Sequence, residues 1–205
     1  MKLPVPPLLV ISDRSQARQP LIEVAEAAFA GGCRWYSLRE KDLPAAERHS
    51  LLAELVAIGG RHGATITTHE DIDSVEAAGA AGVHLPGGSD PVLARRQLPE
   101  GLIGVSAHSA AEATALLRAG ADYVTLSPIF LTDSKPGYGP ALGLDVLTAA
   151  AAAPGPVIAL AGITSDNAAQ CLAAGASGIA VMGEIMRAAD PEAAVRRFLA
   201  AIEKK

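Results

Sequence analysis

A short motif recurs along the chain and limits the folds that the sequence can adopt. Each copy places a glycine where a helix would end and an apolar, strand-like run within two or three residues of it. The clear copies are residues 78–85 (AGAAGVHL), 119–126 (AGADYVTL) and 174–181 (AGASGIAV), and a looser copy spans residues 30–38. Spacings of roughly 40 to 55 residues leave room for one or two βα units per copy. The motif therefore predicts a barrel or a doubly wound sheet.

Eight segments are predicted to be buried strands, and stretches with helical periodicity separate them. The strands are expected at residues 8–12, 34–39, 65–68, 82–85, 102–106, 123–127, 156–161 and 178–182. Helices are expected at residues 21–30, 45–62, 110–119 and 191–204, the last opened by Asp190 as N-cap and Pro191. Strand–helix pairs without a long insertion favour a single (β/α)8 TIM barrel of the α/β class, formed by residues 1–205 as one domain. A doubly wound sheet is the alternative, but no Gly-x-Gly-x-x-Gly turn follows the first strand.

Composition excludes several classes of function. Half of the residues are hydrophobic but only 3% are aromatic, so the core must be built from small aliphatic side chains. The net charge is -5 and no long run of Lys or Arg occurs, which argues against a nucleic-acid partner. No apolar run is long enough to span a membrane, and we expect a cytoplasmic protein. Cys33 and Cys171 lie far apart, without metal-ligand spacing, and are expected to be packing residues.

In such barrels the ligand-binding groups follow the strands, so polar residues at those points are the candidates. Arg39 and Lys41 follow the second strand and alternate with two acids. The segment is either a solvated loop with surface ion pairs or an extended arm whose two cations hold phosphate oxygens.

The loop after the sixth strand is long and contains Thr132, Ser134 and Lys135 between glycines and prolines. This composition suits a lid over a ligand, although an idle surface loop is the alternative. Gly162 follows the seventh strand, and Met182 and Gly183 follow the eighth. These loops, with the N-terminus of a short helix, form the usual phosphate site of TIM barrels, so we expect phosphate binding here.

Two histidines are placed near the predicted ligand site. His84 lies inside the fourth strand and is expected to be a barrel-interior residue satisfied by a neighbour. His108 follows the fifth strand and Ser106. An imidazole there can exchange protons near neutral pH, or the segment can simply cap the next helix; the sequence leaves both interpretations open.

These stretches, taken together, resemble the thiamin-phosphate synthase and TenI family. The resemblance rests on five motifs in the same order: LREK (38–41), GVHL (82–85), IGVSAHS (103–109), PIF with TDSK (128–135) and AGI (161–163). It implies a TIM barrel that binds a thiazole phosphate. Family synthases couple a pyrimidine pyrophosphate to this thiazole by a carbocation-like displacement of pyrophosphate assisted by magnesium. TenI is a thiazole tautomerase, with a histidine at the place of His108 as acid and base.

The chain departs from the synthase pattern at three places. Ser37 stands where a Gln belongs, His69-Glu70 replaces Asn-Asp, and residues 86–90 (PGGSD) replace an acidic segment. The stretch at 85–89 echoes TenI instead. If the chain is a synthase, the resemblance leaves Glu70 and Asp90 as its magnesium ligands.

We therefore expect a TenI-like tautomerase without a cofactor, in which His108 moves the proton of a carboxythiazole phosphate. Ser106, Gly162, Met182 and Gly183 would hold the phosphate, while Arg39, Lys41 and Lys135 would balance its charge. The alternatives are a magnesium-dependent synthase whose Thr132, Ser134 and Lys135 bind pyrophosphate, and a barrel that binds the phosphorylated thiazole without catalysis. Family resemblance also suggests a homodimer.

Overall fold

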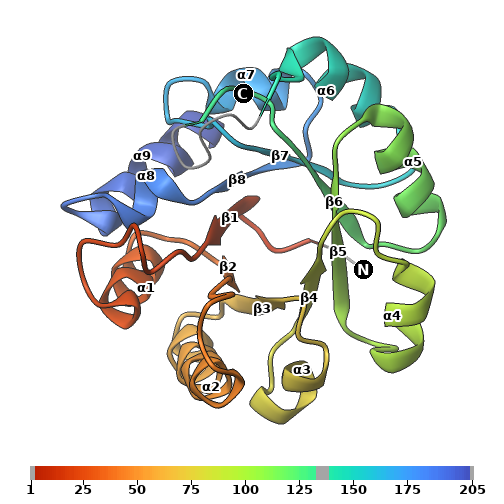
Figure 1. The fold of residues 1–205 in the computed structure, drawn as a ribbon. Coiled ribbons are helices and arrows are strands. Elements are labelled where there is room, and N and C mark those ends of the chain that lie inside the picture. The colour runs from red at the N-terminus through yellow and green to blue at the C-terminus, as the bar shows by residue number, and fades with distance from the viewer. Residues whose placement is uncertain (1–2, 133–138, 204–205) are drawn as a thin grey trace.

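The computed structural model describes residues 3–132 and 139–203. Parallel strands in sequence order close into a barrel, and helices surround it (Figure 1). The strands are β1 (Leu8–Ile11), β2 (Trp35–Leu38), β3 (Thr65–His69), β4 (Gly82–Leu85), β5 (Leu102–Ala107), β6 (Tyr123–Leu126), β7 (Val157–Leu160) and β8 (Gly178–Val181). The predicted (β/α)8 barrel is confirmed, and the doubly wound alternative is wrong because β1 pairs with β8.

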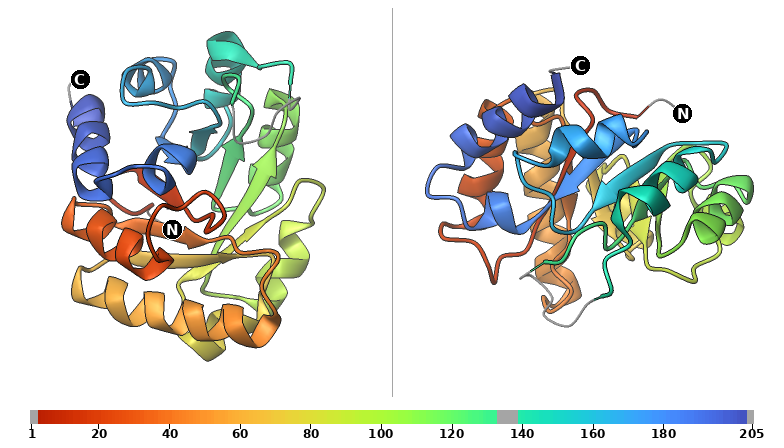
Figure 2. Two further views of the ribbon diagram at one scale, coloured as in Figure 1. Left: turned by 60° about the vertical axis from the view of Figure 1, so that its left-hand side comes forward. Right: turned by 90° about the horizontal axis from the view of Figure 1, so that it is seen from above.

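The helices cover the outer face of the barrel in all three views (Figures 1 and 2). They are α1 (Leu21–Ala30), α2 (Ala45–Arg61), α3 (Asp73–Ala78), α4 (Pro91–Gln97), α5 (Ala110–Arg118), α6 (Gly143–Ala151), α7 (Ala168–Ala173), α8 (Gly183–Met186) and α9 (Pro191–Glu203). Most predicted boundaries hold within one or two residues. The predicted cap of α9 is also present, because Asp190 Oδ1 accepts a hydrogen bond from Ala193 N at 2.9 Å.

The glycine of the recurring motif ends its helix by adopting a left-handed conformation. Gly79, Gly120 and Gly175 have φ angles of 70°, 102° and 95°. A side chain at such a position would strain the backbone, which explains why the motif uses glycine there. Each turn then leads directly into the next strand: β4, β6 or β8.

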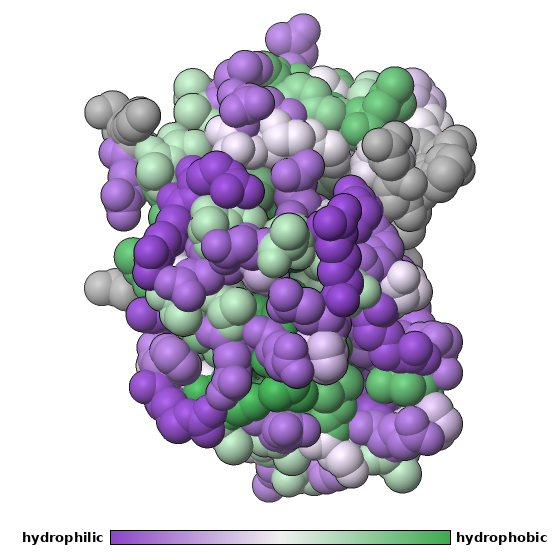
Figure 3. Space-filling view, turned by 90° about the vertical axis from the view of Figure 1, so that its left-hand side faces the viewer, coloured by the Kyte–Doolittle hydropathy of each residue, from purple (hydrophilic) through white to green (hydrophobic). Residues whose placement is uncertain are grey.

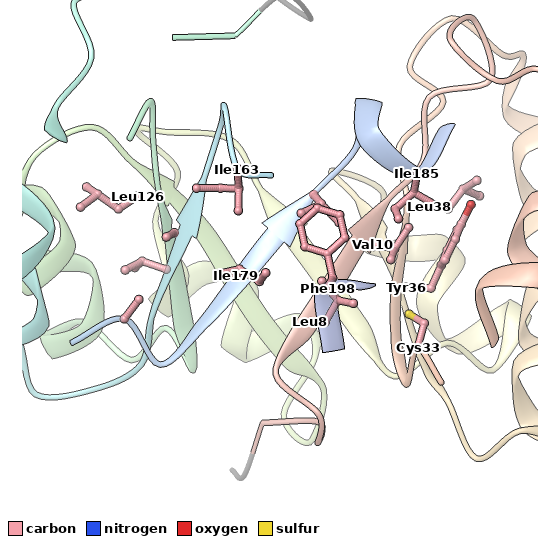
Figure 4. Packing of buried hydrophobic residues seen from close by; sticks show 14 of the residues in the cluster. Leu8, Val10, Cys33, Tyr36, Leu38, Leu126, Ile163, Ile179, Ile185 and Phe198 are labelled. Carbon is pink, nitrogen blue, oxygen red and sulfur yellow. The ribbon is translucent and has the colours of Figure 1, made fainter. Parts of the chain in front are cut away.

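The main apolar core lies between the strands and the helices. Phe198 of α9 lies beside Leu8 and Val10 of β1 in this layer (Figure 4). Cys33 and Cys171 are buried free cysteines, as predicted. Burial raises the pKa of the Cys33 thiol to about 12, so this side chain is an unreactive packing group.

The interior of the barrel has its own apolar cluster. The rings of Trp35 and Tyr123 meet edge to face there, with centroids 4.8 Å apart. Gly104 makes room for this packing, because a Cβ at residue 104 would lie 2.0 Å from Tyr123 Cζ. The two aromatic rings thus fill the middle of the barrel and close it beneath its carboxyl-terminal mouth.

The outer surface shown in Figure 3, on the side of α1 and α9, carries mostly hydrophilic side chains with smaller hydrophobic areas among them. Among the described residues, no helix combines the length and the hydropathy that crossing a membrane requires.

Candidate active site

A pocket of about 360 Å³ opens at the carboxyl ends of the strands. This is the end of the barrel at which TIM-barrel enzymes bind their ligands. The predicted site residues among its lining are Arg39, Lys41, Glu70, Ser106, His108, Thr132, Gly162, Met182 and Gly183. Residues that lie far apart in the sequence therefore meet at one mouth.

The side chains of the loop after β2 alternate between the pocket and the protein interior. Arg39 and Lys41 line the pocket, while the intervening Glu40 is buried on the other side. Glu40 accepts hydrogen bonds from Ser12 Oγ at 2.7 Å and from the backbone N–H of Arg14 at 3.1 Å. Burial raises the pKa of this carboxyl, although these hydrogen bonds oppose the shift. The buried acid anchors the arm and both cations reach the pocket, while the binding of phosphate oxygens by Arg39 and Lys41 stays a prediction.

Lys41 forms an ion pair with Glu70, which follows β3 and also lines the pocket. Glu70 has a φ of 65°, an unusual value for a residue with a side chain. Because its carboxylate is exposed together with the Lys41 ammonium, the pair is a weak one that a charged ligand can rearrange.

His108 is held at the end of β5 by one hydrogen bond from its backbone and one from its ring. Its backbone N–H donates to Glu112 Oε2 at 2.7 Å, and Ser109 Oγ accepts the N–H of Glu112 at 3.1 Å. The ring nitrogen Nδ1 lies 2.9 Å from the carbonyl oxygen of Ser127, to which it must donate. The second nitrogen, Nε2, faces the loop after β4, because a Cβ on Gly87 would lie 3.3 Å from it. The segment both caps α5 and presents an imidazole nitrogen to the pocket, so the two interpretations left open by the sequence are compatible.

His84 is a buried residue of the barrel interior whose neighbours satisfy it, as predicted, yet it also touches the pocket floor. Burial, with smaller contributions from the charges of Lys41 and Arg39, lowers its pKa to about 3. The ring is therefore neutral at physiological pH and cannot serve as a general base that titrates there.

The loops after β7 and β8 line the part of the pocket where we expected a phosphate, here called the phosphate corner, and their glycines have different surroundings. A Cβ on Gly162 would lie 2.4 Å from Leu131 O, so Gly162 is required for packing against the loop after β6. A Cβ on Gly183 would lie 2.4 Å from Arg187 Nη1, at the far end of a flexible side chain. A Cβ on Gly162 would therefore point into protein, and the role of both glycines in binding phosphate stays a prediction.

Arg187 is a lining residue that the sequence analysis did not identify. It lies one helical turn after Gly183 on α8, a spacing that could have revealed it. Asn167 was also missed: it donates to Gly162 O at 2.9 Å and accepts from Thr164 N at 2.9 Å, which holds the loop after β7 in shape.

Thr132 lines the pocket, as the lid interpretation requires. Ser134 and Lys135, the other two residues assigned to that lid, lie outside the described residues.

Comparison with known proteins decides the family. The model of a family described as thiamine monophosphate synthase matches residues 8–185. The chain belongs to this family. The family resemblance inferred from the sequence is thus confirmed, and the chain falls among proteins of thiamine biosynthesis.

Several members of the thiamine monophosphate synthase family are similar to this chain over nearly its full length. A thiamine-phosphate synthase of Methanoculleus marisnigri is 40% identical and covers 92% of each chain. One of Roseiflexus castenholzii is 38% identical, over 91% of this chain and 84% of that protein. The solved structure of thiamine phosphate pyrophosphorylase from Pyrococcus furiosus has a TM-score of 0.87 at 30% identity, over 96% of this chain and 95% of that one. These names favour the synthase alternative over the tautomerase that we expected.

The family resemblance implies magnesium, but the described residues do not build a site for it. Asp90 does not line the pocket; its carboxylate caps α4 by accepting from Val92 N at 2.8 Å. Glu70 is engaged by Lys41. The described chain contains no cluster of three or more His, Cys, Asp or Glu residues with metal-binding geometry. Glu70 thus lines the pocket and Asp90 does not, and the assignment of these two carboxylates as the magnesium ligands of a synthase stays a prediction.

Proposed function

We propose that this protein joins a pyrimidine pyrophosphate to a thiazole phosphate. The observation that carries the proposal is one mouth lined by the cations Arg39 and Lys41 on the β2 loop and by the phosphate corner with Arg187 on the β8 side. The pyrophosphate of one substrate and the phosphate of the other each need a region of the pocket that carries cations. The names of the similar proteins support the same reaction.

In this reaction the C–O bond between the pyrimidine methylene carbon and pyrophosphate breaks, and the electron pair leaves with pyrophosphate. The ring nitrogen of the thiazole then forms a C–N bond with the methylene carbon. Arg39 and Lys41 would stabilise the charge that develops on the leaving group, and this stabilisation is commonly the largest contribution to catalysis. The exposed Lys41–Glu70 pair would open so that the ammonium can turn to pyrophosphate.

Tautomerisation of a carboxythiazole phosphate is the second candidate, and the geometry of His108 favours it. With Nδ1 donating to Ser127 O, Nε2 is the ring nitrogen that can act as an acceptor, and it lies on the side of Gly87, which lines the pocket. That nitrogen could accept a proton from one ring atom of the thiazole and return it to another, so that no net proton is consumed.

One preparation of the enzyme can decide between the two reactions. The first assay supplies pyrimidine pyrophosphate, thiazole phosphate and Mg²⁺ and measures thiamin phosphate and pyrophosphate in equal amounts by chromatography. The second supplies the carboxythiazole phosphate tautomer alone and follows its aromatisation. Turnover in the first assay is expected; aromatisation without any coupling product would replace the synthase proposal by the tautomerase.

A further inference from the structure

Two buried side chains and one partly exposed serine form a continuous hydrogen-bonded column from the barrel interior to the pocket. Tyr123 OH lies 3.1 Å from His84 Nδ1, and His84 Nε2 lies 3.0 Å from Ser106 Oγ. Tyr123 and His84 are almost completely buried, whereas Ser106 is partly exposed and lines the pocket. The column therefore ends at the pocket.

The surroundings of Tyr123 decide the direction of the first hydrogen bond. A buried phenol O–H needs an acceptor, and the indole of Trp35, which packs edge to face against Tyr123, has an N–H that can only donate. Within the described structure, the phenol oxygen has one hydrogen-bond partner, His84 Nδ1. Tyr123 must then donate to Nδ1.

The tautomer of His84 follows from that direction. A neutral imidazole that accepts at Nδ1 carries its hydrogen on Nε2. The Nε2–H group donates toward Ser106 Oγ, with Thr125 Oγ1 at 3.3 Å as a second acceptor. Because Ser106 accepts this bond, its own O–H hydrogen stays available.

We propose that Tyr123 and His84 are positioning residues that hold the Ser106 hydroxyl as a hydrogen-bond donor to a phosphoryl oxygen in the pocket. In the opposite tautomer Ser106 would donate to Nε2, and it would present only lone pairs to an anion. The inference rests on the proposed function insofar as the ligand carries phosphoryl groups, but it concerns anion binding and does not depend on which reaction follows.

The tautomer can be measured directly in the free protein. Nitrogen-15 NMR of histidine-labelled protein should show His84 with a protonated Nε2 and an unprotonated Nδ1. A protonated Nδ1 would overturn the proposal. This measurement needs neither a variant nor turnover.

The function of the column can be tested by titration with two probes, inorganic phosphate and inorganic pyrophosphate. Tyr123→Phe removes one hydroxyl and should weaken binding of at least one probe by about three- to tenfold, the range expected for one hydrogen bond. The probe that responds identifies the phosphoryl group that Ser106 contacts. Tyr36→Phe is a matched control, since Tyr36 is equally buried but its hydroxyl forms no hydrogen bond with any described residue.

A double-mutant cycle separates positioning from a general structural effect. If Tyr123 acts through Ser106, Tyr123→Phe should have no further effect on anion affinity in protein that already carries Ser106→Ala. Additive losses of anion affinity in the double variant, or an unchanged affinity for both probes in Tyr123→Phe, would overturn the proposed role of the column. Absence of thiamin phosphate synthesis would instead contradict the proposed function and leave these results standing.

Discussion

At the scale of single residues, His108 and the two loop glycines separate the possible roles of the pocket. His108 has one imidazole nitrogen committed to Ser127 O and the other turned toward the loop after β4. Gly162 and Gly183 both line the pocket, but the groups that a Cβ would meet differ. These contacts predict that substitution of His108 changes catalysis, whereas the two glycines differ in whether alanine lowers ligand affinity or stability.

His108→Asn should distinguish proton transfer from displacement of pyrophosphate. A positioned general acid or base contributes about 10²- to 10⁴-fold, so tautomerisation should slow by that factor with little change in substrate affinity. Coupling to form thiamin phosphate should fall by less than about tenfold, because a hydrogen bond is lost but no proton transfer. Rates of both reactions from pH 5 to 8, in wild type and variant, provide the measurement. A tautomerase rate that neither falls nor loses pH dependence would remove His108 from that mechanism.

Gly183→Ala should lower affinity for thiazole phosphate more than it lowers stability. The added methyl group displaces the guanidinium of Arg187, a flexible end that can move without unfolding α8. Gly162→Ala is the matched comparison. The methyl group of Gly162→Ala would lie 2.4 Å from the backbone oxygen of Leu131, and residue 162 has a φ of 65°, which strains a residue with a side chain. The melting temperature of this variant should therefore fall more than its affinity. Calorimetric affinities and thermal unfolding of both variants test the contrast, and equal losses in both properties for Gly183→Ala would make this glycine structural.

At the scale of elements, the sequence predicted the strands and several helix ends well because their signals are local. The apolar runs, the motif glycines and the Asp190 cap all act within a few residues of the structure that they specify. Arg187 and Asn167 were not found because their roles depend on the conformation of short loops, which apolar periodicity does not signal: Arg187 packs against Gly183, and Asn167 holds the loop after β7. The cap formed by Asp90 was not foreseen, since a carboxylate that caps a helix looks, in sequence, like one that binds a cation.

Because Asp90 caps α4, substitutions of Asp90 and Glu70 should have different effects on the magnesium dependence of coupling. Asp90→Asn keeps a good N-cap residue for α4 and should leave stability and the magnesium dependence of coupling unchanged. Glu70→Gln removes the only one of the two carboxylates that lines the pocket and should change that dependence. In the free enzyme we expect weak magnesium binding, since this cation usually needs substrate phosphates as well as carboxylates. Calorimetry that finds a tight magnesium site, lost in Asp90→Asn, would contradict this assignment.

At the scale of the whole molecule, the packing of the barrel interior requires a glycine at residue 104. Gly104 lies against Tyr123, and Gly104→Ala would place a methyl group within the aromatic ring. Overpacking of this kind typically costs about 1–3 kcal/mol. Denaturant unfolding should show a loss of at least this size. Gly60→Ala, in α2, should instead leave stability unchanged or slightly raise it, because the added Cβ would meet none of the described atoms within 4 Å apart from the adjacent backbone of its own helix. Similar stabilities for Gly104→Ala and wild type would show that the interior can repack.

The aromatic filling of the barrel has a consequence for the order of events at the mouth. With Trp35 and Tyr123 occupying the interior, molecules exchange with solvent through the carboxyl-terminal opening of the described barrel. A molecule bound on the floor, near Ser106, is then covered by any second molecule that binds above it. We expect two substrates to enter in a fixed sequence and the deeper product to leave last, a pattern that product inhibition would reveal as competitive against the first substrate alone.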